Sequence, residues 1–222
     1  MPATGPASPA YGDSASTATP TTLREELRGL VGPGSRDLWL IYLATFLEYL
    51  GYWSFLQTLS FWLSDIGLDD EAAGWVATGF SLLITLLSFF AGALADTFGV
   101  RRLLIASFVV AAVTRLGMPW ADGQASAVAW VMAYAFGFAL TSPALQVAVN
   151  LASRPATRAF AFSLWYVSFN LAGAVVGVPI DWIRGRFLED GKLVHRLIDL
   201  PLLGEREVSA HAVILACEIG RA

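Results

Sequence analysis

The sequence predicts an all-α membrane protein, and three observations lead to that prediction. First, the 222 residues are 56% hydrophobic and only 14% charged, whereas soluble domains carry about 25% charged residues. Second, two apolar runs, residues 72–95 and 103–120, are each long enough to cross a bilayer as a helix, because a helix rises about 1.5 Å per residue. Third, the segments between apolar runs alternate between acidic and basic, as the two sides of a membrane require.

The apolar runs divide the chain into five membrane-crossing helices and the beginning of a sixth. Residues 37–183 form the predicted five-span bundle, and the polar residues 184–208 are expected to form an external loop. Residues 209–222 contain an apolar run that gives only about 20 Å of helix, which is too short to cross. The sixth helix is therefore predicted to be incomplete. The five predicted spans are Leu38–Leu63, Ala72–Ala95, Leu103–Trp120, Ala127–Leu151 and Ala159–Ile183.

The chain before the bundle has two parts. Residues 1–22 are rich in Pro, Ala, Ser, Thr and Gly and lack the apolar core of a signal peptide, so we predict a disordered cytoplasmic tail. Residues 23–36 are expected to include a short amphipathic helix, because Thr22 and Glu25 fit a capping box and the following leucines share one face.

The charges of the connecting loops predict the orientation of the chain. The loops after the second and fourth spans are basic, and the loops after the first and third spans have no basic residue. Because cytoplasmic loops collect Lys and Arg, the N-terminus is expected in the cytoplasm, and the protein in the cell (inner) membrane as a multi-pass protein. The basic residues are Arg101, Arg102, Arg154 and Arg158, and the acidic ones are Asp65, Asp69, Asp70, Glu71 and Asp122.

One short loop carries a motif, GALADTFGVRR, over residues 92–102. Its glycines let the backbone turn and let helices approach closely, and its aspartate can pair with an arginine or cap a helix. The motif resembles the signature loop of the major facilitator superfamily at Gly92, Leu94, Ala95, Asp96, Gly99, Arg101 and Arg102. The resemblance implies that Gly92, Asp96, Gly99, Arg101 and Arg102 form a conformational latch, in which Asp96 contacts the opposite half and steadies one access state.

The same resemblance implies a fold and a function. The chain would be the N-terminal six-helix half of a major-facilitator-type bundle, with the C-terminal half supplied by the same gene or by a second chain. It would be a secondary active transporter, a symporter or antiporter, that moves a small-molecule substrate across the lipid bilayer by alternating access. The alternatives are a non-transporting scaffold or receptor on the same fold, or a non-functional fragment.

Two further stretches are similar, more faintly, to the proton-coupled oligopeptide transporter branch of that superfamily. They are EYLGYWS, residues 48–54, and FSLWYVSFNLAG, residues 162–173. The second stretch places Tyr166 and Asn170 on matching positions. Tyr49 and Ser142, however, stand where that branch has basic residues, so recognition of peptides through basic groups is not expected.

Glu48 is the strongest candidate for a transport site. It lies near the middle of the first predicted span, where an ionised carboxylate costs about 2.5 kcal/mol or more unless it faces a cavity or a partner. Our hypothesis is that Glu48 couples transport to protons or binds a cationic group of the substrate. The alternative is a neutral, hydrogen-bonded glutamic acid that holds helices together. Tyr52, Tyr166 and Asn170 are expected to line the same cavity as Glu48, as polar groups among apolar walls.

Other features concern the helices themselves. Pro143 and Pro179 are expected to interrupt the fourth and fifth spans. Gly173 and Gly177 form a GxxxG pattern that predicts close helix packing. Arg115 lies near the outer end of the third span and is expected to extend to the water interface.

The spacing of Gly92, Asp96 and Arg101 also occurs a second time in the sequence. Gly177, Asp181 and Arg186 repeat this spacing three spans later, as in the inverted repeats of secondary transporters.

Several classes of function are not expected. Cys217 is the only cysteine, and His195 and His211 are the only histidines, so we predict no intrachain disulfide and no metal site. We also expect no cofactor. No cluster of catalytic groups points to an enzyme, and no basic groove points to nucleic acid as a partner.

Overall fold

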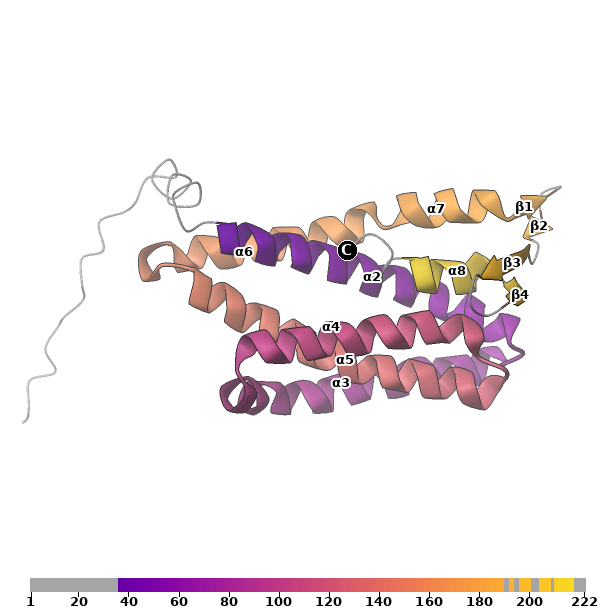
Figure 1. The fold of residues 1–222 in the computed structure, drawn as a ribbon, viewed down its shortest axis with the longest axis horizontal. Helices are drawn as coiled ribbons and strands as arrows, with labels where there is room; N and C mark the ends of the chain where they lie inside the picture. Colours follow the sequence, from indigo (N-terminus) through magenta and orange to yellow (C-terminus); the bar gives the residue numbers. More distant parts are fainter. Residues whose placement is uncertain (1–35, 190–191, 194–195, 201–203, 209, 218–222) are drawn as a thin grey trace, which may run out of the picture.

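A computed structural model describes residues 36–189, 192–193, 196–200, 204–208 and 210–217 of the chain. The predicted tail of residues 1–22 and nearly all of the predicted helix of residues 23–36 lie outside the described residues. Within them, long helices run side by side along the longest axis (Figure 1). The prediction of a bundle of long apolar helices is confirmed for residues 36–186.

The helices follow the predicted spans closely. They are α2 (Arg36–Asp65), α3 (Asp70–Phe98), α4 (Val100–Gly117), α5 (Gln124–Ala152), α6 (Arg158–Val175), α7 (Gly177–Arg186) and α8 (Ala210–Cys217), with short 3-10 turns at η1 (Met118–Trp120) and η2 (Pro155–Thr157). By length and composition, four helical segments could cross a membrane: Asp70–Phe98, Val100–Trp120, Gln124–Ala152 and Pro155–Arg186. The 30 residues of α2 are long enough to cross, but Glu48 and the hydroxyl groups of this helix lower its hydropathy below that of these four segments.

The connections between the helices alternate between the two ends of the bundle (Figure 1). The α3–α4 turn and the α5–α6 connection lie at one end, so Arg101, Arg102, Arg154 and Arg158 gather there. The α2–α3 and α4–α5 connections lie at the other end, with the acidic residues. The two copies of the Gly–Asp–Arg spacing, in α3–α4 and in α7, also lie at opposite ends.

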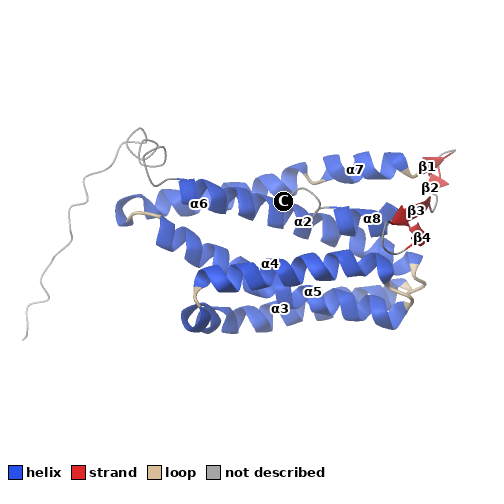
Figure 2. Cartoon of the chain, in the orientation of Figure 1, coloured by secondary structure: helices blue, strands red, loops and turns tan. Residues whose placement is uncertain are grey.

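The segment after α7 contains strands, which the sequence analysis did not predict. β1 (Leu188–Glu189) pairs with β2 (Lys192–Leu193), and β3 (Arg196–Leu200) pairs with β4 (Gly204–Val208), in two antiparallel hairpins (Figure 2). Leu200 pairs with Gly204 and Arg196 with Val208. Backbone pairing within each hairpin gives this polar segment internal hydrogen bonds. The sequence analysis missed these strands because the segment is short and polar and shows no regular spacing of apolar residues.

Gly99 forms the turn between α3 and α4. Its φ of 81° and ψ of 139° lie in a region that is essentially restricted to glycine. Its N–H donates to the carbonyl of Ala95 (3.0 Å), and its own carbonyl accepts from Leu103 (3.1 Å). One residue therefore ends α3 and begins α4, as the motif predicts.

The two prolines have different effects. Pro179 lacks the N–H that would bond to the carbonyl of Val175, and α6 ends at Val175 before α7 begins at Gly177. The fifth span is therefore interrupted as predicted. Pro143, in contrast, lies inside α5, which is assigned as one helix from Gln124 to Ala152. The prediction that it interrupts the fourth span is wrong, because Ser88 Oγ of α3 donates to the carbonyl of Ala139 (3.3 Å), which the proline leaves without its helical N–H donor.

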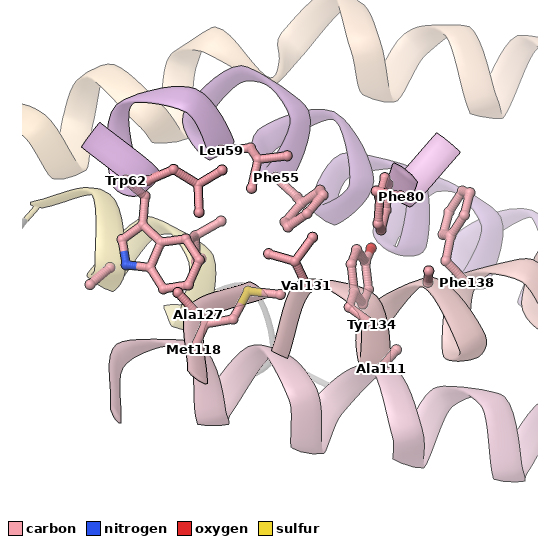
Figure 3. Close-up of a cluster of buried hydrophobic side chains, with 14 of the residues drawn as sticks. Phe55, Leu59, Trp62, Phe80, Ala111, Met118, Ala127, Val131, Tyr134 and Phe138 are labelled. Carbon is pink, nitrogen blue, oxygen red and sulfur yellow. The ribbon is translucent and has the colours of Figure 1, made fainter. Parts of the chain in front are cut away.

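The core is built around α5, which packs against α3 and α4. Figure 3 shows Phe55, Phe80 and Tyr134 with their rings in contact. Gly137 allows α5 to approach α4, since a Cβ at this position would lie 2.8 Å from the backbone nitrogen of Ala111. Small residues at the helix contact, rather than apolar burial alone, bring membrane helices together.

The GxxxG pattern is only half realised. A Cβ on Gly173 would lie 3.0 Å from Nε1 of Trp53 in α2, so α6 does pack closely there. Gly177 has no neighbour within 4 Å of such a position, and neither has Gly92. Close packing at Gly92 and Gly177 is therefore not found among the described residues.

The short helix α8 is held against the end of α2. His211 Nδ1 lies 2.7 Å from Asp65 Oδ2, and its ring stacks on Phe61 with centroids 5.6 Å apart. Arg184 of α7 covers Phe61 at 5.3 Å from the ring centroid. These contacts join α2, α7 and α8 at the acidic end of the bundle.

Candidate functional site

Glu48 lies inside the bundle, on α2. Its exposed fraction is 8%, and its Oε1 is buried with no hydrogen-bond partner. A buried polar atom without a partner is costly, and natural structures keep few of them. The position of Glu48 is therefore one at which a proton or a ligand group would be stabilised.

Arg115 of α4 is buried near the same part of α2. Its exposed fraction is 5%, its Nη2 donates a hydrogen bond to Tyr134 Oη of α5, and its Cζ lies 4.6 Å from the centroid of the Tyr134 ring. The prediction that Arg115 extends to the interface is wrong. The physical reason is that Tyr134 offers both a hydroxyl and a ring face, which together replace water around the guanidinium.

Gly51 makes room for this guanidinium. A Cβ at position 51 would lie 2.6 Å from Cζ of Arg115, so any side chain here would displace the arginine. Gly51 is three residues after Glu48, and residues at this spacing share one face of a helix. The arginine therefore reaches the face of α2 that carries Glu48.

The charges of Glu48 and Arg115 interact. Arg115 and Glu48 carry opposite charges at the same face of α2, and a charge acts more strongly in a low-dielectric interior than in water. Within the described residues, these two are the only buried members of the Asp, Glu, Lys and Arg classes. We call Glu48, Arg115 and Tyr134 the buried charge cluster.

Aromatic rings surround the cluster on the side of α5 and α6. Tyr49 donates to or accepts from Ser142 Oγ at 2.8 Å, so the two positions that depart from the oligopeptide branch bond to each other. Tyr52 stacks on Phe138 with centroids 4.0 Å apart, and Phe169 packs edge-on against Tyr49 at 4.5 Å. These residues form a neutral wall of hydroxyl groups and rings next to Glu48.

The structure does not bring all the predicted site residues together. Tyr52 is half-buried in the aromatic wall, on the same helix as Glu48. Tyr166 is 59% exposed and reaches the wall only through Phe169, at 5.6 Å between centroids. Asn170 is exposed, and its Nδ2 donates to the carbonyl of Tyr166 at 2.7 Å. Tyr166 and Asn170 lie on the outer face of α6.

The α3–α4 turn presents its charges to the outside. Asp96, Arg101 and Arg102 are all exposed, and no hydrogen bond or ion pair joins Asp96 to another residue of the described chain. Helix α3 also carries an open groove of about 500 Å³, lined by Ala77, Thr78, Ser81, Leu82 and Thr85. The hydroxyls of this groove bond to carbonyls one turn earlier, as in Thr78 to Gly74 at 2.9 Å.

A comparison with protein families identifies the fold. The family described as Major Facilitator Superfamily matches residues 41–181. The chain belongs to the major facilitator superfamily. Searches of the curated proteins and of the solved structures found no match. The superfamily match gives no support to the narrower resemblance to oligopeptide transporters.

The match covers the buried charge cluster and the α3–α4 turn of this superfamily member. Sequence reasoning found Glu48 but missed Arg115, Tyr134 and Gly51. A signal for Arg115 was present: small and polar residues share its face of α4, while Val109, Val113 and Leu116 lie on the exposed face. In a membrane helix, the small and polar face packs against other helices and large apolar residues face lipid.

Proposed function

We propose that this superfamily member is the N-terminal half of a secondary active transporter, and that it moves a small solute by alternating access with proton coupling at Glu48. One observation carries the proposal: a carboxyl group is buried inside the bundle, and its Oε1 has no hydrogen-bond partner. Ionisable residues at such depth mark ion or substrate pathways in membrane proteins. A carboxyl group can take up a proton there and release it when the site opens to the other side.

The surroundings of Glu48 favour a neutral or cationic partner. The Tyr49–Ser142 hydrogen bond and the stacked rings of Tyr52 and Phe138 offer no positive charge to a substrate carboxylate. Aromatic faces and a carboxylate together bind protonated amines well. We therefore include a cationic group of the substrate as the second ligand that Glu48 would hold.

The exposed faces of α3 and α6 support a second half. Only 17% of the apolar window of each segment is buried, and the exposed face of α3 includes hydroxyl groups as well as Asp96. Polar groups that face lipid are unfavourable, so we propose that a C-terminal half, from the same gene or a second chain, covers these faces. In that assembly Asp96, with Arg101 and Arg102, would contact the opposite half and act as the latch.

The orientation follows from the end of the bundle that carries the arginines. Arg101, Arg102, Arg154 and Arg158 share that end, and basic residues accumulate on the cytoplasmic side. The N-terminus of α2 lies at the same end (Figure 1). We propose a cytoplasmic N-terminus in the cell (inner) membrane.

The test uses the full-length protein in proteoliposomes. A pH gradient that drives protons into the vesicles is applied in the presence of a panel of organic cations, neutral solutes and dipeptides. Charge movement is recorded on a solid-supported membrane. We expect a pH-gradient-driven current with at least one probe class, which Glu48→Gln abolishes while exchange of the same probe persists.

The matched control is Glu71→Gln, the same substitution at an exposed glutamate in the first turn of α3. It is expected to leave the current at the wild-type level. A current that persists in Glu48→Gln would remove the coupling role of Glu48. Absence of any current with correctly inserted wild-type protein and every probe class would argue for a non-transporting role.

A further inference from the structure

Arg115 connects three helices at the level of Glu48. It extends from α4, contacts the Tyr134 ring of α5, and occupies the space that Gly51 leaves on α2. A long cationic side chain on a membrane helix normally reaches for water. Arg115 instead remains inside the bundle, on the face of α2 that carries the buried carboxyl group.

Contacts with the Tyr134 side chain hold the guanidinium of Arg115 in position, and these contacts do not involve Glu48. The phenol oxygen accepts a hydrogen bond from Nη2, and the ring face lies 4.6 Å from Cζ. Tyr134 is itself fixed, because its ring packs against Phe55 at 4.8 Å and Phe80 at 5.8 Å (Figure 3). The arginine can therefore keep its position whether Glu48 is ionised or neutral.

The titratable groups around this part of the bundle can be named helix by helix. On α2, Tyr49 and Tyr52 lie within about one turn of Glu48; α4 supplies Arg115, beside Gly51, and α5 supplies Tyr134, which is bonded to Arg115. The elements α3 and α6 contribute rings to the adjacent core, Phe80 and Phe169. In α8, His211 is bonded to Asp65 at the far end of α2. Arg115 is thus the one buried arginine or lysine among the described residues, and it lies on the face of α2 that carries Glu48.

We propose that Arg115 is the positioning residue of the Glu48 site: held between Tyr134 and Gly51, it supplies the counter-charge to the ionised carboxylate, and a proton or a protonated amine of the substrate takes over that task. The proposal rests on the function proposed above and specifies its ligand class. With Arg115 in place, the ionised site is neutral overall. Adding one positive charge at Glu48 leaves Arg115 on the Tyr134 ring, whose face attracts cations.

An anionic substrate does not fit this arrangement equally well. It would lie beside the Glu48 carboxylate, where like charges repel in a low-dielectric interior, and the Tyr49–Ser142 hydrogen bond offers it no positive charge. The ligand class for this half of the site is therefore a proton or an organic cation.

The first experiment follows the protonated carboxyl group of Glu48 by infrared difference spectroscopy of the full-length protein in lipid, titrated over pH. Glu48→Gln identifies the band by removing it. In Arg115→Gln the protonated form is expected to persist to higher pH than in the wild type, by about one pH unit or roughly tenfold in proton affinity, because the carboxylate has lost its counter-charge.

Three variants sharpen this readout. Arg115→Lys keeps the charge without the planar fork and is expected to restore most of the wild-type midpoint. Tyr134→Phe keeps the ring and removes the hydrogen-bond acceptor, so it should shift the midpoint less than Arg115→Gln. Arg154→Gln removes an exposed arginine of the α5–α6 connection and should leave the midpoint unchanged. An Arg115→Gln midpoint equal to that of the wild type overturns the proposal.

A second experiment covers the case in which Arg115→Gln does not fold. Melting temperatures are compared for Glu48→Gln, Arg115→Gln and the double variant. If the two charges compensate each other, the double variant melts above Arg115→Gln, because a lone buried charge is worse than none. A double variant that melts at the sum of both losses overturns the proposal. Neither readout requires transport. Failure of the proposed transport function, seen as the absence of current, can therefore be distinguished from failure of the proposed role of Arg115.

Discussion

The buried charge cluster and the α3–α4 turn contain the same kinds of residue in opposite environments. Each has one acidic side chain and at least one arginine, together with a glycine that shapes the backbone or the space around it. In the cluster, Glu48 and Arg115 are buried, and Gly51 makes room for the guanidinium. In the turn, Asp96, Arg101 and Arg102 are exposed, and Gly99 adopts a backbone angle that other residues avoid.

The difference shows that burial, rather than residue type, decides what a charge does in this fold. A charge inside the bundle must be compensated by its neighbours, so its removal changes stability and the properties of the other charge. A charge at the water boundary is solvated and contributes little to the stability of the half that carries it. Such an exposed charge remains available to contact another part of the assembly.

Of these two regions, the buried charge cluster should respond more strongly to one added methyl group, at Gly51. Gly51→Ala places a Cβ on the Arg115 guanidinium, which is buried and hydrogen-bonded to Tyr134. We expect a loss of about 2–3 kcal/mol in the free energy of unfolding, which is typical of overpacking in a core. Equilibrium unfolding in mixed detergent micelles measures it.

Gly92→Ala is the matched control for Gly51→Ala, because a Cβ at Gly92 has no neighbour within 4 Å. It should unfold at the wild-type denaturant concentration or slightly above it, since alanine favours a helix over glycine by about 1 kcal/mol. If Gly51→Ala were as stable as Gly92→Ala, Arg115 would not be confined as the structure shows.

A smaller effect is expected from the glycine of the turn. Gly99→Ala must adopt a φ of 81° and ψ of 139°, which costs about 1–2 kcal/mol for a residue with a side chain. The loss arises from the backbone, so Gly99→Asn should not rescue it, because asparagine favours a left-handed helical ψ instead. Melting temperatures of the two variants test this, and a fully stable Gly99→Ala would mean that the turn relaxes to another backbone shape.

The smallest effect on stability is expected at Asp96. Asp96→Asn should change the free energy of unfolding by less than about 0.5 kcal/mol, because the carboxylate has no partner in the described chain and is exposed to water. In the full-length protein the same variant is expected to change the rate of solute exchange, if the latch operates. A loss of stability comparable to that of Gly51→Ala would show that Asp96 binds a partner within this half.

Local sequence signals predicted the positions of the helices well. Gly99 ends α3 and begins α4, and Pro179 separates α6 from α7, because each acts through its own backbone geometry. The same logic failed at Pro143, where α5 continues. A proline need not interrupt a helix when a neighbouring helix supplies a donor for the freed carbonyl, as Ser88 of α3 does for Ala139.

The sequence was less informative about the site. Glu48 was found because a carboxylate in an apolar run is unusual wherever it points. Arg115 was misjudged because its distance from the end of the span suggested water, whereas the contact with Tyr134 on a different helix holds it inside. Tyr166 and Asn170 match a motif, yet they lie on an exposed face of α6.

The sequence by itself determined that this chain crosses a membrane, where its helices begin and end, and which connections carry positive charge. Those properties depend on apolar length, turn residues and loop charge, all of which are local. Only the tertiary structure decided which face of each helix is buried and which charges meet. The reason is that lipid and the interior of the bundle are equally apolar, so hydrophobicity does not distinguish the two faces. The packing of α4 and α5 on α2 is what places Arg115 beside Gly51 and within electrostatic reach of Glu48.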